Sequence, residues 1–245
     1  QPDLPQARYM LGESLLKSGD VAAAEIELRK ARDLKHPDDE VVPSLAQAML
    51  AQGKFKKVIE DFAATKLGAA SAMAELQVTL ALAYDADRNT AASQRALQAA
   101  LAADPGNVDA TLVQIRQKIA TRDVDGAAAQ LEALLAKQPG NPEAWALKGD
   151  MQFYYGKGTR DEALASFRKA MELRPSFVTG HFGAITVLFA QNKLDEVEKA
   201  LAELKKVAPN HPQTRYAEAQ LAFAKKDFPK ARELAQQLLK VAPTY

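Results

Sequence analysis

Apolar residues recur at helical spacing along the chain, in stretches of about a dozen residues that short polar breaks separate. The breaks combine turn-forming residues with an acidic or capping residue, as in KSGD (17–20), DADRN (85–89) and AQNK (190–193). A new apolar-periodic stretch follows each break, and no β-strand pattern interrupts the series. The pattern therefore predicts pairs of helices, each pair joined by a tight turn.

Prolines mark the ends of these helix pairs at a nearly constant interval. The series is Pro37, Pro105, Pro139, Pro175, Pro209 and Pro243. Its intervals are 68, 34, 36, 34 and 34 residues, so one unit of 34 explains them with one missing proline and one two-residue insertion. Proline ends a helix because it lacks a backbone N–H and restricts the residue before it. The pair without a proline is expected to end through Gly68 as a helix C-cap.

Small and large residues form separate columns within these units. The first helices carry a small column: Gly12, Ala46, Ala81, Gly149 and Ala219. The second helices carry another: Ala24, Ser93, Ala127, Ala163 and Ala231. One turn further on, the second helices carry large residues: Leu28, Phe62, Leu97, Leu131, Phe167 and Leu201. Small residues opposite large ones allow two helices to pack closely.

This pattern resembles the tetratricopeptide repeat, most clearly in PEAWALKGDMQFYYG (142–156) and DEALASFRKAMELRP (161–175). The resemblance implies an all-α fold, a right-handed α-solenoid of about seven helix-turn-helix repeats. The repeats are expected to start near residues 5, 39, 74, 108, 142, 178 and 212 and to form a single solenoid over 1–245. The fourth repeat departs from the pattern at Gln114 and Lys118. Because Gln1 is not an initiator methionine, we expect the chain to be a fragment of a longer repeat protein.

The charge, hydrophobicity and cysteine content of the chain argue against several kinds of partner and site. The 32 basic and 31 acidic residues give a net charge of +1, which does not favour nucleic-acid binding. No apolar run reaches the length of a membrane span, so this chain is not expected to insert into a membrane directly. The absence of cysteine excludes disulfides and thiolate metal sites.

The stretch YYGKGTRDEA (154–163) raises the alternative of a phosphate-binding loop. Such a loop requires G-x-x-x-x-G-K-[ST] between a strand and a helix. Here Gly158 follows Lys157, and Met151 stands where the first glycine is required. The stretch is therefore expected to be a turn between helices, lengthened by two residues, with Thr159 or Asp161 capping the next helix.

No catalytic residue, cofactor site or metal site is predicted. The three histidines, His36, His181 and His211, lack metal-ligand spacing and are expected to lie at the surface or at helix caps. Carboxylate pairs such as Asp161-Glu162 precede helices, where the helix dipole explains them. No G-x-S-x-G motif occurs.

A solenoid of this type has a concave face that is lined by the first helix of each pair. In the resembling family this face binds extended peptides or partner helices, so we expect a protein or peptide partner here. The candidate residues are Tyr9, Glu13, Leu82, Arg116, Asp150, Phe153, Tyr154, Phe182, Phe189, Tyr216, Gln220 and Phe223. Exposed aromatic rings are typical of binding hot spots. The alternative is that they only pack between neighbouring first helices.

Two further expectations concern partners. Members of the family that bind the C-terminal carboxylate of chaperones use recurring Asn and Lys or Arg on this face. Residues such as Gln47, Leu82 and Thr186 stand there instead, so that clamp is not expected. The last helix has an apolar face of Leu234, Leu238 and Val241 without a polar capping helix after it. Either more repeats follow in the intact protein, or this helix pairs with another molecule, so that self-association through it is expected.

Residues 11–55 and 203–243 further resemble the tetratricopeptide-repeat lipoprotein of bacterial PEP-CTERM/exosortase systems. The resemblance implies a periplasmic, membrane-anchored protein that is associated with exopolysaccharide and protein sorting. The expected function is a non-enzymatic interaction scaffold. Two alternatives are a substrate-recruiting repeat region of an enzyme whose catalytic domain is absent here, and a cytoplasmic adaptor.

Overall fold

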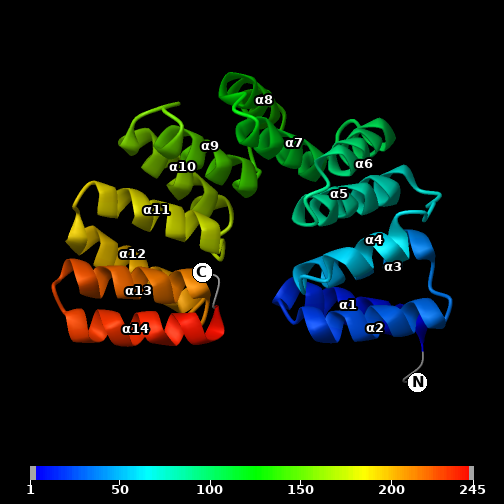
Figure 1. The fold of residues 1–245 in the computed structure, drawn as a ribbon, viewed down its shortest axis with the longest axis horizontal. Helices are drawn as coiled ribbons and strands as arrows, with labels where there is room; N and C mark the ends of the chain where they lie inside the picture. The colour runs from blue at the N-terminus through cyan, green and yellow to red at the C-terminus, as the bar shows by residue number, and fades with distance from the viewer. Residues whose placement is uncertain (1–3, 243–245) are drawn as a thin grey trace. The chain divides into compact units, whose positions relative to one another are not determined.

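The computed structural model describes residues 4–242, and this range contains fourteen α-helices and no strand (Figure 1). The all-α fold predicted from the sequence is confirmed. The helices are α1 (Pro5–Ser18), α2 (Val21–Asp33), α3 (Asp38–Ala51), α4 (Phe55–Phe62), α5 (Ala70–Ala86), α6 (Thr90–Ala103), α7 (Val108–Ala120), α8 (Val124–Lys137), α9 (Pro142–Tyr154), α10 (Arg160–Leu173), α11 (Val178–Ala190), α12 (Leu194–Val207), α13 (Pro212–Ala224) and α14 (Phe228–Val241).

The turn inside each helical hairpin contains one residue in the left-handed backbone region. The seven residues are Gly19, Gly53, Arg88, Arg122, Gly156, Asn192 and Lys226, with φ between 57° and 87°. A positive φ reverses the chain within two or three residues. In several turns a side chain then caps the next helix; Asp20, for example, accepts a hydrogen bond from the Ala23 N–H at 3.2 Å. The short connections inside the repeats therefore share a residue with positive φ.

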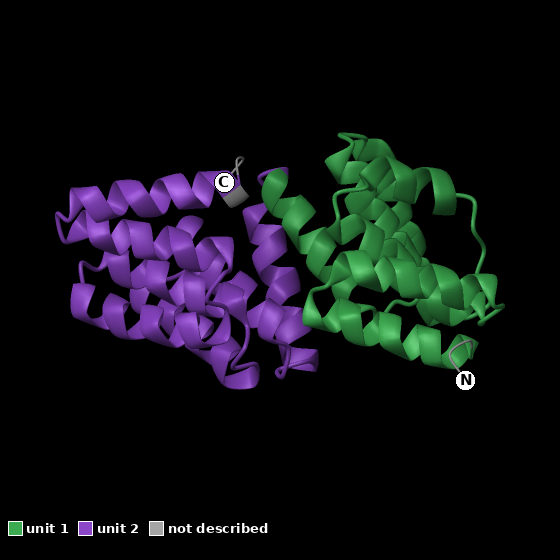
Figure 2. Ribbon diagram, turned by 90° about the horizontal axis from the view of Figure 1, so that it is seen from below, with its two compact units in different colours: residues 1–120 green, residues 121–245 purple. Residues whose placement is uncertain are grey.

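The chain divides into two compact units, residues 1–120 with α1–α7 and residues 121–245 with α8–α14 (Figure 2). Each unit has its own apolar core. In unit 1 the core includes Leu28, Leu45 and Phe62, and in unit 2 it includes Phe167 and Ile185. Consecutive hairpins pack side by side within each unit.

The small and large columns meet as predicted in the hairpins that contain glycine. A Cβ atom on Gly12 would lie 2.6 Å from Leu28 Cγ, and one on Gly149 would lie 2.9 Å from the Phe167 ring. Gly183, on the next first helix, also touches this ring, and a Cβ there would overlap it. Phe167 is therefore enclosed by glycines of α9 and α11.

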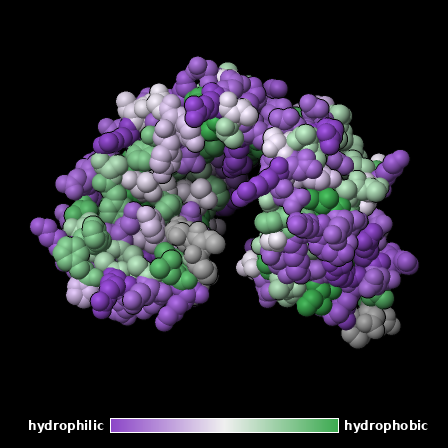
Figure 3. All heavy atoms as spheres, in the orientation of Figure 1, coloured by the Kyte–Doolittle hydropathy of each residue, from purple (hydrophilic) through white to green (hydrophobic). Residues whose placement is uncertain are grey.

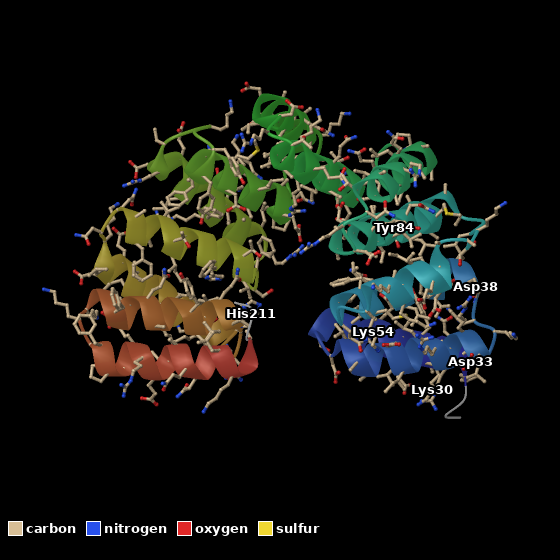
Figure 4. The ribbon with its side chains drawn as sticks, viewed as in Figure 1. Lys30, Asp33, Asp38, Lys54, Tyr84 and His211 are labelled. Atoms are coloured by element: carbon tan, nitrogen blue, oxygen red, sulfur yellow. The ribbon has the colours of Figure 1, made fainter. Side chains whose placement is uncertain are left out.

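An ion-pair network around the buried Glu25 side chain ties α2 to the end of α3 and the start of α4. The Glu25 carboxylate accepts hydrogen bonds from Arg29 Nε at 3.0 Å, Gln52 Nε2 at 2.7 Å and Lys54 Nζ at 2.6 Å. Figure 4 labels Lys54, which lies in the turn before α4. Burial raises the pKa of Glu25, but these hydrogen bonds outweigh it and hold the pKa below its ordinary value.

The prediction that Gly68 caps the second helix of its hairpin is wrong. That helix, α4, ends at Phe62 after only eight residues. The Asp39 side chain instead accepts hydrogen bonds from the N–H groups of Gly68 at 2.7 Å and Ala69 at 3.1 Å. This carboxylate fixes the connection into α5.

The stretch 154–163 is a turn followed by a helix. Gly156 has φ 68°, and Thr159 and Glu162 form a reciprocal capping box at the start of α10. Lys157 pairs with Asp125 of the same unit. The predicted cap at Thr159 is confirmed, and a strand, which a phosphate-binding loop requires, does not precede it within the described residues.

Two of the three histidines do not lie where the sequence placed them. His36 and His181 are buried. The His36 ring stacks on Tyr9 with centroids 4.6 Å apart, and His181 donates from Nε2 to the Pro175 carbonyl at 2.8 Å. His211 is a cap, because its Nδ1 accepts the Gln213 N–H at 3.2 Å at the start of α13 (Figure 4). Helical periodicity did not reveal that the two buried rings pack against neighbouring elements.

Within residues 4–242, none of the helices has both the length and the apolar composition that crossing a membrane requires. The same residues contain no group of three or more His, Asp or Glu side chains that could hold a metal ion.

Candidate partner-binding surfaces

Most of the aromatic candidates lie on three first helices of unit 2. We define the aromatic face by the candidate residues of α9, α11 and α13: Asp150, Phe153, Tyr154, Phe182, Phe189, Tyr216, Gln220 and Phe223. Phe182 and Phe189 are seven residues apart on α11, and Tyr216 and Phe223 are seven apart on α13, so each pair occupies one side of its helix. The repeat thus aligns aromatic residues from consecutive hairpins.

Contacts between side chains join five members of this face in two groups. The rings of Phe153 and Tyr154 meet edge to face at 4.7 Å, and those of Phe182 and Tyr216 lie 6.1 Å apart across α11 and α13. Gln220 Nε2 donates to the Tyr216 hydroxyl at 3.1 Å. Aromatic pairs at these distances restrain one another and present a preformed surface.

Exposure divides the aromatic face into two kinds of residue. Phe153, Phe182 and Phe189 are half-buried and pack against the apolar core of unit 2. Tyr154 and Phe223 are 59% and 65% exposed. Three rings of this face therefore pack against the core of unit 2, and two are exposed.

The charge of this face is set mainly by Asp150. Burial raises the pKa of Tyr154, and the nearby Asp150 carboxylate and Tyr216 raise it further. Since an ordinary tyrosine titrates near pH 10, Tyr154 is a neutral phenol at physiological pH. Its hydroxyl can donate or accept a hydrogen bond beside an apolar ring surface.

One end of the aromatic face opens into a hollow with a volume of about 660 Å³, here called the terminal hollow. Its lining residues are Phe189, Ala219, Gln220, Phe223, Phe228, Ala231, Arg232 and Ala235. Phe223 and Phe228 meet nearly edge to face at 5.5 Å across the turn between α13 and α14. Figure 3 shows apolar side chains gathered on unit 2 near the ends of its last helices.

Sequence reasoning missed the part of this hollow that α14 contributes. Phe228, Ala231, Arg232 and Ala235 belong to a second helix, whereas candidates were sought only on first helices. Ala231 had been identified as a member of the small column. Small side chains leave space when no large residue covers them. The small column was therefore the sequence signal that could have revealed this part of the hollow.

The candidates in unit 1 do not form a comparable cluster. Tyr9 is half-buried beneath its stacking contact, and Glu13 pairs with Lys17 at 3.3 Å. Leu82 and Arg116 are exposed on α5 and α7, respectively. The structure thus brings the aromatic candidates of unit 2 together, whereas the unit 1 candidates Tyr9 and Glu13 on α1, Leu82 on α5 and Arg116 on α7 form no aromatic cluster.

Acidic groups dominate the surroundings of Tyr9 instead. Burial raises the pKa of Tyr9, and the Glu13 and Glu40 carboxylates raise it further. Burial likewise raises the pKa of Glu75, followed by the effects of Asp109 and Glu13. The surroundings of Tyr9 and Glu75 in unit 1 are therefore acidic, whereas the aromatic face of unit 2 is mainly apolar.

Family comparison matches the chain to the model described as Tetratricopeptide repeat, over residues 83–151 and 154–221. The two matches cover more than half of the chain and include α11 and most of α9 and α13. A search of curated proteins found no match.

Solved structures share the fold at low sequence identity. PilF of Pseudomonas aeruginosa is 15% identical, with a TM-score of 0.53 over 98% of this chain and 93% of that one. A tetratricopeptide repeat protein of Parabacteroides merdae is 12% identical, with a TM-score of 0.62 over 97% and 93%. Yeast Tom70 is 17% identical, with a TM-score of 0.60 over 91% of this chain and 45% of Tom70. At these identities the likeness shows the fold.

Proposed function

Because this chain belongs to the tetratricopeptide repeat family, we propose that it is a non-enzymatic scaffold that binds a segment of a partner protein. Tetratricopeptide repeats generally mediate protein–protein interaction, and proteins built from them are typically non-catalytic. The observation that carries the proposal is the aromatic face of unit 2, on which Tyr154 and Phe223 are exposed beside half-buried rings.

The chemistry of the aromatic face suits an apolar segment with a few polar groups. Rigid rings supply contact area at a small cost in conformational entropy, and tyrosine adds a hydrogen bond at its edge. Asp150 and the Tyr154 hydroxyl would orient the segment, while Phe223 would cover its apolar side chains. The half-buried rings would support this surface from beneath.

We propose a role in the bacterial envelope, in protein sorting that is associated with exopolysaccharide, as a periplasmic lipoprotein. The support is the resemblance of residues 11–55 and 203–243 to the lipoprotein of PEP-CTERM/exosortase systems. We also propose that the chain associates with itself through its last helix. Leu238, one of the residues that suggested this, is buried, so the support is the neighbouring Leu239, which is 53% exposed. The side chain of Val241 lies outside the described part.

Crosslinking capture from native envelopes tests the binding role. We expect the Tyr154→Ala and Phe223→Ala chains each to lose a partner that the wild-type chain captures, because each removes an exposed ring. The matched control is Tyr155→Ala, which removes the neighbouring ring, itself 45% exposed, from outside the aromatic face. Crosslinks of the partner should map to α9, α11 and α13. Identical partners for all four chains would refute the assignment of this face.

A further inference from the structure

In unit 2, a basic side chain on α9 lies between an aromatic ring and a carboxylate. The Lys148 Nζ atom lies 5.3 Å from the centroid of the Trp145 ring and 2.8 Å from Glu132 Oε1. The face of an aromatic ring carries partial negative charge and attracts a cation, and a carboxylate beside the ring adds a charge-assisted hydrogen bond. The ring and the carboxylate therefore act together on one cation.

The connection between α10 and α11 contains the same arrangement. The Arg174 Cζ atom lies 5.1 Å from the centroid of the Phe177 ring, and its Nη1 atom lies 2.5 Å from Glu143 Oε1. Arg174 is the C-cap of α10, and Phe177 directly precedes α11. Unit 2 thus holds a basic side chain with a ring and a carboxylate at two places.

Asp150, Phe153 and Tyr154 present a carboxylate and two rings within about one turn of α9. Residues three and four positions apart lie on the same side of a helix. The two rings meet edge to face at 4.7 Å, and Tyr154 is 59% exposed. Within residues 4–242, no basic side chain lies over either ring. This turn therefore presents a ring and a carboxylate like those that hold Lys148 and Arg174, with the Tyr154 ring accessible.

The negative charge of Asp150 acts on the Tyr154 phenol. Burial raises the pKa of this phenol, and the Asp150 carboxylate raises it further, because a second negative charge beside the first is unfavourable. The same field favours a positive charge at the ring. Asp150 is the one charged residue among the eight that define the aromatic face, since Thr186 and Gln220 occupy the corresponding positions of α11 and α13. The charge of the face therefore favours a cation at α9.

Apolar rings adjoin this turn of α9. Tyr216 of α13 also contributes to the raised pKa of Tyr154, so the two side chains are near each other. The Tyr216 ring lies 6.1 Å from the ring of Phe182, which packs against the core of unit 2. A segment with a basic side chain at Tyr154 would therefore place neighbouring side chains over apolar rings.

We propose that the aromatic face selects segments in which an arginine or lysine neighbours apolar residues, with the basic side chain over the Tyr154 ring and beside the Asp150 carboxylate. The inference rests on the proposed function as a segment-binding scaffold and names the chemistry of the segment. Arginine should be preferred to lysine, because its planar, weakly hydrated guanidinium stacks on rings and offers a carboxylate two parallel donors.

Selection from a phage-displayed library of short random peptides tests this preference. Peptides selected on the wild-type chain should be enriched in arginine, and less strongly in lysine, next to apolar residues. Asp150→Asn should weaken this enrichment, and Asp150→Lys should shift it towards aspartate and glutamate, because the new ammonium repels a basic residue. The matched control is Glu172→Gln, which neutralises an exposed carboxylate of α10 outside the aromatic face and should leave the preference unchanged. Far-UV circular dichroism checks that each variant is folded.

Fluorescence anisotropy with a selected, labelled peptide measures the contribution of the charge. Replacing its arginine by citrulline, which keeps the shape and removes the charge, should weaken binding by about tenfold. Tyr154→Ala should weaken binding of the arginine peptide by a similar factor. The citrulline exchange should then have a smaller effect in Tyr154→Ala than in the wild-type chain, because the ring and the charge interact directly.

The outcomes separate this preference from the binding role itself. Selected peptides that crosslink to α9, α11 and α13 without enrichment of basic residues would overturn the preference and leave the binding role intact. The same holds if Asp150→Lys selects the same peptides as the wild-type chain. Failure to select any peptide, or crosslinks that map outside these three helices, would instead count against the binding role of the aromatic face.

Discussion

Phe167 shows how single residues determine the spacing of the hairpins. Its ring is buried between Gly149 of α9 and Gly183 of α11, and neither position has space for a Cβ atom. Glycine inside a helix costs about 0.5–1 kcal/mol relative to alanine. Contact with the ring is the physical reason that both helices keep it.

Gly183→Ala is expected to destabilise the protein by about 1–3 kcal/mol, because overlap with a rigid ring outweighs the gain in helix propensity. The measurement is the free energy of unfolding in urea. Gly180→Ala is the control in the same helix: a Cβ there meets the flexible Met171 side chain at 3.1 Å, which can move. A Gly183→Ala chain as stable as the control would show that the ring is not tightly held.

At the scale of elements, the short helix α4 is held in place by the Glu25 network and by the Asp39 carboxylate more than by helix propensity. Helix α4 has only eight residues, too few to be stable through propensity alone. Lys54, next to its first residue, is bound by Glu25, and the connection after it is held by Asp39. Side chains of neighbouring helices therefore position this short element.

Glu25→Gln is expected to lower the free energy of unfolding at pH 7 by about 1.5–3 kcal/mol, the range for hydrogen bonds to a charged group. The folded pKa of Glu25 is depressed, so its contribution is present above the ordinary value of 4.5 and is lost as pH falls through the folded pKa. The difference between the two chains should therefore shrink in acid. Urea unfolding from pH 3 to pH 7 measures it.

The matched control is Glu60→Gln on α4, where the side chain is largely exposed. It should change stability by less than about 0.5 kcal/mol at any pH. A difference between wild type and Glu25→Gln that does not vary with pH would contradict the role assigned to the charge.

Features that depend on residues close together in the sequence were predictable, and features that depend on distant residues were not. The helix pairs, the Thr159 cap and the glycine contacts with Leu28 and Phe167 depend on local spacing and one repeated period, and the sequence revealed them. The connection into α5 depends on Asp39, which lies about thirty residues away from the amides that it binds, so it leaves no local pattern. The terminal hollow combines side chains of α11, α13 and α14, and in the sequence only the small residue Ala231 pointed to the part of it on α14.

The whole molecule consists of two units with separate apolar cores. In repeat proteins each repeat contacts only its neighbours, so stability is distributed along the chain instead of being shared by one centre. Damage to one core should therefore remain local.

Phe167→Ala, which removes a fully buried ring, should cost about 3–5 kcal/mol. Amide hydrogen exchange should accelerate in α9–α12 and stay unchanged in α1–α4. Leu28→Ala, in the core of unit 1, is the mirror-image variant and should affect α1–α4 alone. Uniform acceleration in both units, in either variant, would show that the chain opens as one cooperative body.

The turn between α9 and α10 has a practical consequence. Residues 155–158 are exposed, and the Thr159–Glu162 box starts α10 whatever the length of the preceding segment. This hairpin already accommodates two residues more than its neighbours. A peptide epitope or a fluorophore attachment sequence inserted after Gly156 should leave the helices in phase, which offers a handle for immobilising the protein with its first and last helices free.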